Sequence, residues 1–526
     1  MKKKGKRILP CLLTLMFLLG LVPMTVFAAP PTQGSGTSAD PYIISTAEEF
    51  IAFCDDVNEE GNTYLEKYIR LDADITLTDQ NWTPVGVSNT KPFKGTFDGN
   101  GHIITIDLQV NKIQFQNYAG LFGYVDTMAT IKNLNVAGSL KTEDGTQQNN
   151  GSITGTNKGL IYNCHSSAAV SGGVQTGGIA GSNDGTIEAC SYSGTVTGVD
   201  SYTGGIVGMN GNGKVRKCYN SGTINGVNYV GGIAGSNGKG MEFCYNTGSV
   251  SGNKAIGGLA GFNFSTTSYS YSTGSVSGNE SVGLLFGMKN GAVTNSYFLS
   301  DSVVDEGENS GTCKTSEQFA SGEVTYLLNN GVTDGTQVFY QTCGQGLPAY
   351  SGQTVYQIKN YACPGDTVGT DAYSNTDEDV TGEHSYTQER AEDQYLKSTA
   401  TCTEPAVYYK SCTGCGLAST TETFVSGTAL GHSVVKVEGK APTATKTGNI
   451  TYWYCSRCGK YFKDSGVTQE ITKEETVLAA TGENVSESTT YNPKTGDSSN
   501  MELWIVLLLL AFGSMSGALL YKKIGQ

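Results

Sequence analysis

The residues best suited to chemistry are cysteines near the C-terminal end of the chain. Cys412 and Cys415 belong to one Cys-x-x-Cys-Gly turn, and Cys455 and Cys458 belong to a second. A turn of this kind brings two thiolates together, so the two turns could supply four ligands to one tetrahedral zinc ion. Such a site would be structural, because four protein ligands leave no open position for catalysis.

The spacing of these cysteines leaves a second arrangement open. Between Cys415 and Cys455 lie 39 residues, whereas zinc ribbons usually have a gap of about 15 to 20. A site within the first module would instead add Cys402 and His384 to the first turn. The second module, which begins at His432, has Ala444 or Thr445 where the counterpart of Cys402 should fall.

Disulfide bonds are the alternative to metal binding, since they are the usual state of paired cysteines outside the cell. Free thiols are the third possibility. Cys54, Cys313, Cys343 and Cys363 lie outside the repeats described below, and their pairing cannot be read from the sequence.

Acidic residues and histidines do not form a recognisable catalytic set. Glycoside hydrolysis needs two carboxylates across a cleft, and lyase chemistry needs a base with a cation or metal to stabilise the developing charge. Asp98 and His102 are close in sequence, but polar loop residues usually cap or face solvent. The acidic residues of the middle segment occur singly and out of register, at Asp184, Glu188, Asp200, Glu242 and Glu280. We therefore expect no catalytic residues.

The middle of the chain has a composition of its own. Of the 70 glycines in 526 residues, 33 fall in residues 151–300, together with only 7 Lys and Arg and 5 Asp and Glu. Glycine is far below one residue in three and follows no Gly-X-Y period, which excludes collagen. The formal net charge of −14 has the wrong sign for nucleic-acid binding.

This glycine-rich segment repeats a unit of 26 to 28 residues in three registers. The first is a Gly-Gly-Ile/Leu-x-Gly landmark at 177–181, 204–208, 231–235 and 257–261, with weaker copies at 119–123, 151–155 and 283–287. The second is Cys164, Cys190, Cys218 and Cys244, continued by Ser270 and Ser296. The third is Asn157, Asn183, Asn210, Asn237 and Asn263.

Between these landmarks the segments read as strands of four to six residues, rich in Val, Ile, Thr and Tyr and bounded by Gly and Asn. One unit is too small to bury its own apolar face, so the units must stack, with each strand pairing to its equivalent one turn away. The sequence therefore predicts an all-β fold, a parallel β-solenoid with turns of about 26 residues.

Stacking assigns a role to each register. We expect the Cys and Ser positions to form a ladder of small inward side chains, because free cysteine often behaves as a small buried hydrophobe. Disulfide bonding or metal binding is the alternative for the four cysteines. The Asn register suits a corner, because Asn tolerates left-handed backbone and its amides can bond to the copies above and below. Glycine allows positive φ or close packing at the turns. Tyrosines just beyond the Cys ladder, at Tyr192, Tyr219, Tyr245 and Tyr271, could form a face that stacks on sugars, or could simply alternate inward and outward.

The Gly-rich landmark resembles the GLUG motif of bacterial surface proteins, including regions that precede IgA-cleaving metallopeptidases. The lead-in, with residues 36–42, 71–75 and 93–102, is similar to openings of right-handed β-helices of the pectin-lyase type. This resemblance implies a right-handed solenoid. The His-Glu-x-x-His motif of the metallopeptidase domain is absent from the sequence.

Both ends of a solenoid expose unpaired strand edges and need covers. Ser45 or Thr46 can cap a helix through Glu48, Phe50 and Val57, which would cover the N-terminal end. Residues 316–330 have apolar side chains at helical spacing and could close the other end.

The two termini predict where the protein goes. Residues 1–28 combine Lys and Arg, an apolar run and small residues before Ala28, which is typical of a cleaved signal peptide. Residues 503–521 form an apolar span followed by Lys522 and Lys523. With Asn492, Pro493, Lys494, Thr495 and Gly496 before it, this span resembles the LPxTG-like sorting signal of Gram-positive surface proteins.

In that family a sortase cuts between Thr and Gly, here Thr495 and Gly496, and joins the Thr to peptidoglycan. Asn492 stands where Leu is usual, which leaves the class of sortase open. A retained single-pass membrane anchor is the alternative. Both place the mature protein at the cell surface.

The expected organisation follows from these features. It comprises a signal peptide (1–28), a solenoid (36–350) with an N-cap (41–118), GLUG-like repeats (119–300) and a C-cap (301–350), a linker (351–383), two Cys-x-x-Cys β-modules (384–482), a second linker (483–491) and the sorting signal (492–526). The expected function is a non-catalytic, cell-wall-anchored adhesin or stalk that binds a host or environmental glycan or an extracellular protein. The alternative is a polysaccharide lyase or hydrolase on a β-helix.

Overall fold

The computed structural model describes residues 33–110, 117–142, 148–301 and 311–482. The chain divides into two compact units, with the boundary between His384 and Ser385. The signal peptide, the second linker and the sorting signal expected at the termini lie outside the described residues. Within the described residues, no helix is long and apolar enough to span a membrane.

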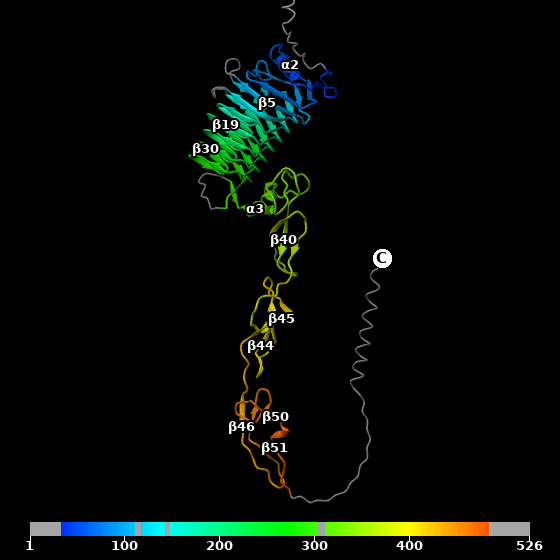
Figure 1. The fold of residues 1–526 in the computed structure, drawn as a ribbon, viewed down its shortest axis with the longest axis vertical. Coiled ribbons are helices and arrows are strands. Elements are labelled where there is room, and N and C mark those ends of the chain that lie inside the picture. The colour runs from blue at the N-terminus through cyan, green and yellow to red at the C-terminus, as the bar shows by residue number, and fades with distance from the viewer. Residues whose placement is uncertain (1–32, 111–116, 143–147, 302–310, 483–526) are drawn as a thin grey trace, which may run out of the picture. The chain divides into compact units, whose positions relative to one another are not determined.

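Parallel strands stacked in successive turns build the first unit, which confirms the predicted β-solenoid (Figure 1). Four columns of strands run through it. The first column is a ten-stranded sheet of β1 (Tyr42–Ile44), β2 (Tyr68–Leu71), β4 (Thr96–Asp98), β8 (Thr130–Lys132), β12 (Leu160–Tyr162), β17 (Thr186–Glu188), β22 (Lys214–Arg216), β27 (Met241–Glu242), β32 (Thr267–Ser268) and β37 (Val293–Thr294).

The second and third columns are seven-stranded sheets on either side of the Gly-rich landmark. The second contains β6 (Tyr118–Ala119), β10 (Asn149–Gly151), β15 (Gln175–Gly177), β20 (Ser201–Gly204), β25 (Asn228–Gly231), β30 (Lys254–Gly257) and β35 (Glu280–Gly283). The third contains β7 (Phe122–Val125), β11 (Thr154–Asn157), β16 (Ala180–Asn183), β21 (Val207–Asn210), β26 (Ala234–Asn237), β31 (Ala260–Asn263) and β36 (Phe286–Lys289).

The fourth column is a 15-stranded sheet whose later turns are split into two short strands each. It contains β3 (Ile75–Asp79), β5 (Ile103–Val110), β9 (Asn135–Thr142), β13 (His165–Ser166), β14 (Ala169–Gly172), β18 (Ser191–Tyr192), β19 (Thr195–Gly198), β23 (Tyr219–Asn220), β24 (Thr223–Asn225), β28 (Tyr245–Asn246), β29 (Val250–Ser251), β33 (Tyr271–Ser272), β34 (Val276–Ser277), β38 (Tyr297–Leu299) and β39 (Thr312–Lys314).

The inward positions of the stacked strands form ladders that confirm two of the predicted registers. The Asn side chains of the third column are fully buried, and each amide from Asn157 to Asn237 donates to the next Asn, as from Asn183 Nδ2 to Asn210 Oδ1 at 2.8 Å. The cysteine thiols are also buried and donate to main-chain carbonyls, as from Cys190 Sγ to Glu188 O at 3.2 Å. Ser270 makes the equivalent bond to Ser268 O at 2.8 Å, so serine fits the same slot.

Left-handed backbone occurs at a different corner, immediately before the Cys ladder. Ala189 (φ 55°), Lys217 (φ 50°) and Phe243 (φ 53°) occupy this position in successive turns, and Asn133 and Asn163 occupy it in earlier ones. For residues other than Gly, Asn and Asp, left-handed backbone is unfavourable by about 1 kcal/mol. The left-handed backbone expected at the Asn register is therefore not observed, because the Asn residues of the buried ladder end extended strands instead.

We expect Ala189→Asn to raise the free energy of unfolding by about 0.5 kcal/mol, because Asn tolerates left-handed backbone better than Ala. Ala189→Val at the same site should lower it by about 1 kcal/mol or more, since β-branched residues are the least tolerant. Chemical denaturation followed by circular dichroism compares the two. Equal effects of Asn and Val would contradict the role of backbone conformation.

A helix covers the N-terminal end of the solenoid, as expected. α2 (Ala47–Asn58) begins after Thr46, whose side chain accepts a hydrogen bond from Glu49 N while the Glu49 side chain accepts from the Thr46 N–H. Phe50 and Phe53 are buried, and their rings pack on Phe97 at centroid distances of 5.9 and 6.2 Å. The helix therefore closes the aromatic core of the first turns.

Two short helices follow the last repeat, α3 (Ser316–Ser321) and α4 (Glu323–Leu328). Phe319 of α3 packs its ring 5.7 Å from that of Tyr271. Phe339 and Tyr350 from the following loop lie against the same row of tyrosines, and Tyr350 Oη donates to Cys218 O at 3.1 Å. This segment therefore covers the outward side of the fourth column, along several turns.

Residues 351–383 are not the linker that we expected. They contain β40 (Tyr356–Tyr361), β41 (Thr370–Ser374) and β42 (Val380–Thr381), which form a three-stranded sheet. Tyr373 packs its ring 5.7 Å from that of Tyr326 in α4. Ile358 of β40 is buried and Tyr373 is half-buried beside α4, so the segment packs on the preceding helices.

The second unit is built from small antiparallel sheets. One contains β43 (Leu396–Ser398), β44 (Ala406–Ser411) and β45 (Ala418–Ser426), beside the 3-10 helix η2 (Asp393–Tyr395). Another contains β46 (Val434–Val437), β48 (Tyr452–Cys455), β49 (Tyr461–Phe462) and β50 (Glu470–Ile471). A third pairs β47 (Gly448–Asn449) with β51 (Val477–Leu478), which follows η3 (Glu474–Thr476).

Candidate functional site

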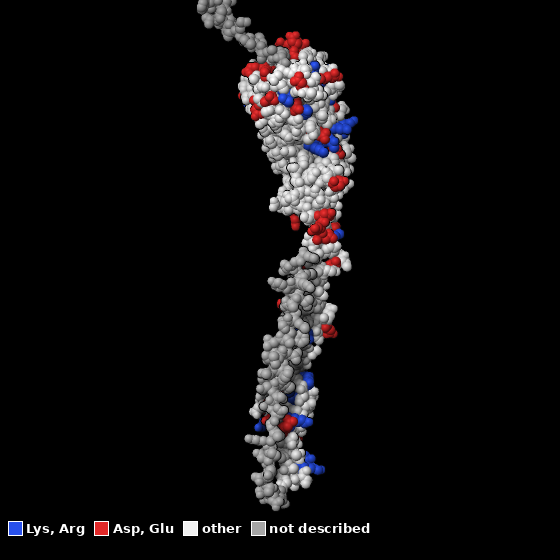
Figure 2. All heavy atoms as spheres, turned by 90° about the vertical axis from the view of Figure 1, so that its right-hand side faces the viewer, with Lys and Arg blue, Asp and Glu red and all other residues white. Residues whose placement is uncertain are grey.

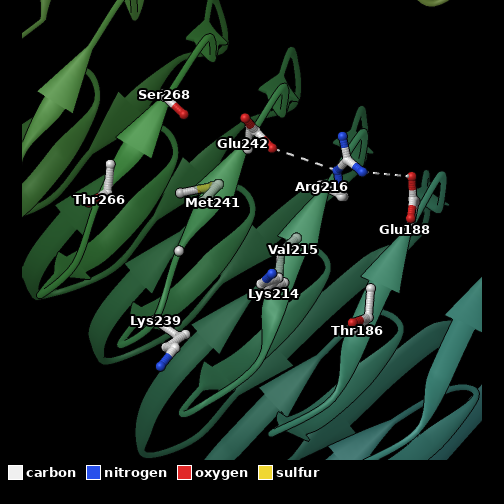
Figure 3. A pocket seen from close by; sticks show the side chains of 11 residues that line it. Thr186, Glu188, Lys214, Val215, Arg216, Lys239, Met241, Glu242, Thr266 and Ser268 are labelled. Atoms are coloured by element: carbon white, nitrogen blue, oxygen red, sulfur yellow. Dashed lines mark ion pairs between the residues drawn. The ribbon is translucent and has the colours of Figure 1, made fainter.

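A groove crosses four adjacent turns of the first column, over β17, β22, β27 and β32 (Figure 3). Its volume is about 500 Å³. Side chains at alternate positions of these strands face it, because neighbouring residues in a strand point to opposite sides. The residues that line it are Thr186, Glu188, Lys214, Val215, Arg216, Lys239, Gly240, Met241, Glu242, Thr266 and Ser268.

A row of alternating charges runs along one side of this groove. Arg216 Nη1 lies 3.5 Å from Glu188 Oε1, and Arg216 Nε lies 3.7 Å from Glu242 Oε2. The three residues occupy equivalent positions in consecutive turns, where Glu188 pairs with Arg216 and Arg216 with Glu242 in the strand register. Both carboxylates thus form ion pairs with the same guanidinium. No histidine lines the groove.

Charge is otherwise sparse on this part of the molecule. Figure 2 shows basic and acidic side chains gathered in a few places on one face, with much of the solenoid surface between them uncharged. Lys214 and Lys239 add two more cations to the groove. The groove can therefore make polar and ionic contacts to a chain that lies across the turns, but it offers no obvious general base.

The four tyrosines just beyond the Cys ladder divide between two registers. Tyr192 aligns with Ser166 and Asn220, points inward and is fully buried, with its hydroxyl donating to Ala168 O at 2.7 Å. Tyr219, Tyr245 and Tyr271 point outward and stack at centroid distances of 4.8 and 5.0 Å. A one-residue offset reverses the side to which a strand residue points.

The outward row is also covered, because Tyr245 and Tyr271 are buried beneath residues 316–350. These tyrosines are therefore not a surface on which a sugar could stack. Of the two alternatives that the sequence left open, the alternation of inward and outward tyrosines is the one observed, and the exposed face is not.

Asp98 and His102 do not contact one another. The His102 ring makes its contact with Asp74, with Nδ1 3.0 Å from Asp74 Oδ1. Burial opposes ionisation of Asp98, but hydrogen bonds from Asn133, Asn100 N and Lys132 outweigh it and lower the pKa of that carboxyl. Asp98 therefore stabilises a corner of the solenoid.

The two Cys-x-x-Cys turns have the same backbone structure. In the first, Cys412 N donates to Leu417 O and Gly416 N to Cys412 O, at 2.8 and 2.9 Å. In the second, Cys455 N donates to Lys460 O and Gly459 N to Cys455 O, again at 2.8 and 2.9 Å. Gly416 and Gly459 both have left-handed φ, of 75° and 76°, which explains the Gly after each motif.

The structure assigns the two turns to separate groups of possible metal ligands. Cys455 and Cys458 gather with Cys402 and His432, and the ligand atoms of these four residues all lie within 4.8 Å of one another. Desolvation opposes ionisation of Cys455, but N–H groups of Cys458 and Arg457 and the His432 ring lower the pKa of its thiol to about 5.

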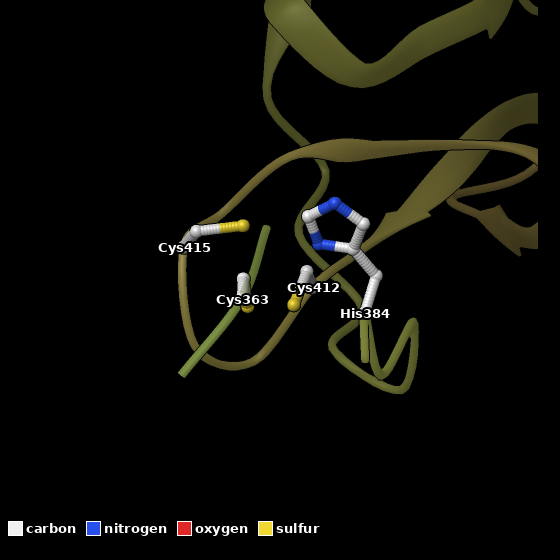
Figure 4. A group of neighbouring side chains, drawn as sticks. All are labelled: Cys363, His384, Cys412 and Cys415. Carbon is white, nitrogen blue, oxygen red and sulfur yellow. The ribbon is translucent and has the colours of Figure 1, made fainter. Parts of the chain in front are cut away.

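Figure 4 shows the first turn, with the side chains of Cys412 and Cys415 at its two ends. Cys363 and His384, which belong to the first unit and have ligand atoms within 4.8 Å of one another, are labelled in the same view. The described residues thus contain Cys and His groups that could hold a metal ion.

Sequence reasoning singled out Cys402 and both Cys-x-x-Cys turns. One of its two arrangements placed the four turn cysteines at one site, and the other placed Cys402 with the first turn. It missed His432 as a partner of Cys455 and Cys458. The signal was present, because His384-Ser385 and His432-Ser433 both precede a Cys-x-x-Cys turn. Ser385 O and Ser433 O accept equivalent hydrogen bonds at 3.0 Å from Thr413 N and Ser456 N in the two turns.

Comparison with known proteins identifies one family motif and a few partial relatives. Residues 200–225 match the GLUG motif. A Gly-rich membrane protein of Evansella cellulosilytica is 32% identical over 145 residues, which are 28% of this chain and 16% of that protein. Halomucin of Haloquadratum walsbyi is 29% identical over 153 residues, which are 28% of this chain and 2% of halomucin. The chain thus spans only a small part of either relative.

Among solved structures, a chain from Bacteroides ovatus named as an immunoglobulin A1 protease matches 60% of this chain and 94% of its own length. The sequence identity is 20% and the TM-score is 0.38.

Proposed function

We propose that this is a non-catalytic surface protein, an adhesin or stalk, that displays its solenoid outside the cell and binds an extracellular glycan or protein. The groove over β17, β22, β27 and β32 carries the proposal. It lies across successive turns, so an extended polymer could contact equivalent side chains at intervals of about 4.8 Å. Its carboxylates pair with Arg216, which favours binding over acid–base chemistry.

The names of the relatives and the two termini of the chain support a surface location. A Gly-rich membrane protein and halomucin both match part of the chain. The apolar N-terminal run and the Asn492–Gly496 motif before residues 503–521 support export by a signal peptide and attachment by a sortase to the peptidoglycan of a Gram-positive cell.

A binding screen of the intact protein against glycans and extracellular-matrix proteins tests the proposed function. Lys214→Glu combined with Lys239→Glu should weaken binding of a captured ligand about tenfold or more, because both cations of one side are reversed. Lys141→Glu, on an exposed position of β9 outside the groove, is the matched control and should leave binding unchanged. Equal weakening by both, or no captured ligand, would contradict the groove proposal.

A polysaccharide-processing enzyme is the second candidate, and one observation favours it. Glu188 and Glu242 face the same groove from strands two turns apart, which is about 9.6 Å at the usual strand spacing. Inverting glycosidases place their carboxylates up to about 9.5 Å apart, which is close to this strand separation. Release of reducing ends from a polysaccharide, lost in both Glu188→Gln and Glu242→Gln, would establish this function instead.

We also propose that the Cys and His groups of the second unit bind zinc in a structural role. Thiolate and imidazole are the ligands that zinc prefers, and a full set of four leaves no position for a substrate. The donors of the group around Cys455 meet this requirement, with three thiols and one imidazole. Disulfide bonding is the competing state outside the cell.

A further inference from the structure

We propose that a single zinc ion bound by Cys402, His432, Cys455 and Cys458 links two successive sheets of the second unit. This inference rests on the proposed structural zinc and adds to it which residues share the ion and what the ion holds together. The third thiolate comes from the module that precedes the Cys-x-x-Cys turn, rather than from the turn's own module.

The spacing of the ligand atoms fits one tetrahedral ion. Zn–S bonds of about 2.3 Å at tetrahedral angles separate two sulfurs by about 3.8 Å, and one sulfur and one nitrogen by about 3.5 Å. Cys402 Sγ lies 3.7 Å from Cys455 Sγ, and Cys458 Sγ lies 3.3 Å from His432 Nδ1. A disulfide would instead bring two sulfurs to about 2.0 Å.

The four ligands come from different elements. Cys402 lies in the loop between β43 and β44, in the sheet that β45 completes. Cys455 ends β48, and Cys458 follows in the turn that leads to β49. His432 lies two residues before the start of β46, with its ring 4.7 Å from that of Phe462. An ion held by all four therefore joins the β43–β45 sheet to the β46–β50 sheet.

Few other contacts are available to hold these sheets together. The buried apolar side chains of residues 385–482 are Tyr395, Cys402, Cys412, Cys455 and Phe462, so three of the five are cysteines. Polar contacts across the junction include Leu430 N to Thr401 O at 2.8 Å and Arg457 Nη1 to Leu430 O at 2.6 Å. A unit with so small an apolar core needs a crosslink to be stable.

Zinc-protected alkylation of the intact, reduced protein tests the proposal without any substitution. With Zn²⁺ bound, Cys402, Cys455 and Cys458 should become protected together from a thiol-alkylating reagent, and a chelator should expose them together. Cys313, which is exposed and lies in the first unit, is the internal control and should react at the same rate in both states.

Cys402→Ser provides the second measurement. It should reduce bound zinc by about one equivalent per chain, and it should increase amide hydrogen exchange in both β44 and β48. Cys313→Ser should change neither quantity. Co²⁺ substituted for zinc should give the absorption of a tetrahedral thiolate site in the wild type, with weaker thiolate bands in Cys402→Ser.

The outcomes separate this inference from the proposal beneath it. Zinc that protects Cys455 and Cys458 but not Cys402, or that stays bound in Cys402→Ser, would overturn the link between sheets and leave structural zinc standing. Absence of bound zinc, or a Cys402–Cys455 disulfide detected as a crosslinked peptide in the isolated protein, would overturn both.

Discussion

Gly204→Ala is expected to lower the free energy of unfolding of the solenoid by about 3 kcal/mol or more. The added Cβ would lie 2.1 Å from Val207 O and 2.8 Å from Gly235 N. Both are main-chain atoms, one in the same turn and one in the next, so neither can move aside by a rotamer change. The equivalent Cβ atoms at Gly177 and Gly231 would meet the same conflict, each at 2.1 Å from a carbonyl oxygen.

The loss should be visible as a lower midpoint of chemical denaturation and as faster amide exchange in β20, β21, β25 and β26. Gly240→Ala is the matched control, since the nearest atom to its new Cβ is Thr266 O at 4.0 Å. That substitution should change the free energy of unfolding by no more than about 0.5 kcal/mol. Similar effects of the two substitutions would show that close approach of the backbone does not explain the Gly landmark.

Asn210→Ala should lower the free energy of unfolding by about 2 to 5 kcal/mol, because it interrupts the buried amide ladder in its centre. Asn210 accepts from Asn183 Nδ2 at 2.8 Å and donates to Asn237 Oδ1 at 3.0 Å and Gly240 O at 3.2 Å. The substitution leaves buried polar groups on both sides without those partners. An unsatisfied buried group costs about 1 to 3 kcal/mol.

Asn212→Ala is the comparison for this ladder variant. Asn212 is exposed and its contacts are to Asp184 Oδ1 at the surface, through the main-chain N–H at 3.0 Å and the amide at 3.4 Å. We expect a change of no more than about 0.5 kcal/mol. Equilibrium denaturation of both variants measures the difference, and a small loss for Asn210→Ala would mean that water or rearrangement satisfies the ladder.

Much of the solenoid could be predicted because repetition makes its packing visible in the sequence. The Asn register repeats at every turn from Asn157 to Asn263. Because equivalent residues stack one strand spacing apart, each amide can hydrogen-bond to the Asn of the next turn. The replacement of Cys by Ser at 270 likewise indicated a small inward slot. Local signals also sufficed for α2, whose Thr46 and Glu49 form the cap.

The tyrosine rows show how a one-residue offset defeats this reasoning. Tyr192 is two residues after its cysteine, whereas Tyr219, Tyr245 and Tyr271 each follow their Cys or Ser directly. Because side chains alternate along a strand, that offset sends Tyr192 into the core and the others outward. Residues 316–350 cover the outward row. This is a long-range contact, and the sequence of the repeat does not indicate it.

The grouping of the second-unit cysteines was beyond the sequence for a related reason. Cys402 lies 53 residues before Cys455, and the spacing does not indicate which loop lies beside a given Cys-x-x-Cys turn. The packing of one sheet beside the next determines which cysteines come together. The repeated His-Ser dipeptides were the only local indication of the imidazole ligand.

The stacking of equivalent turns also bears on how such chains change over generations. Residues 204–230 and 231–256 each supply one complete turn and begin with the same landmark, so unequal recombination between their coding segments would delete or duplicate a whole turn. The buried Asn ladder and the close backbone contacts at the Gly landmark would continue across the new junction, since each turn contacts chiefly its neighbours. Relatives that differ by whole units would then differ in reach by about 4.8 Å per unit while keeping the same fold.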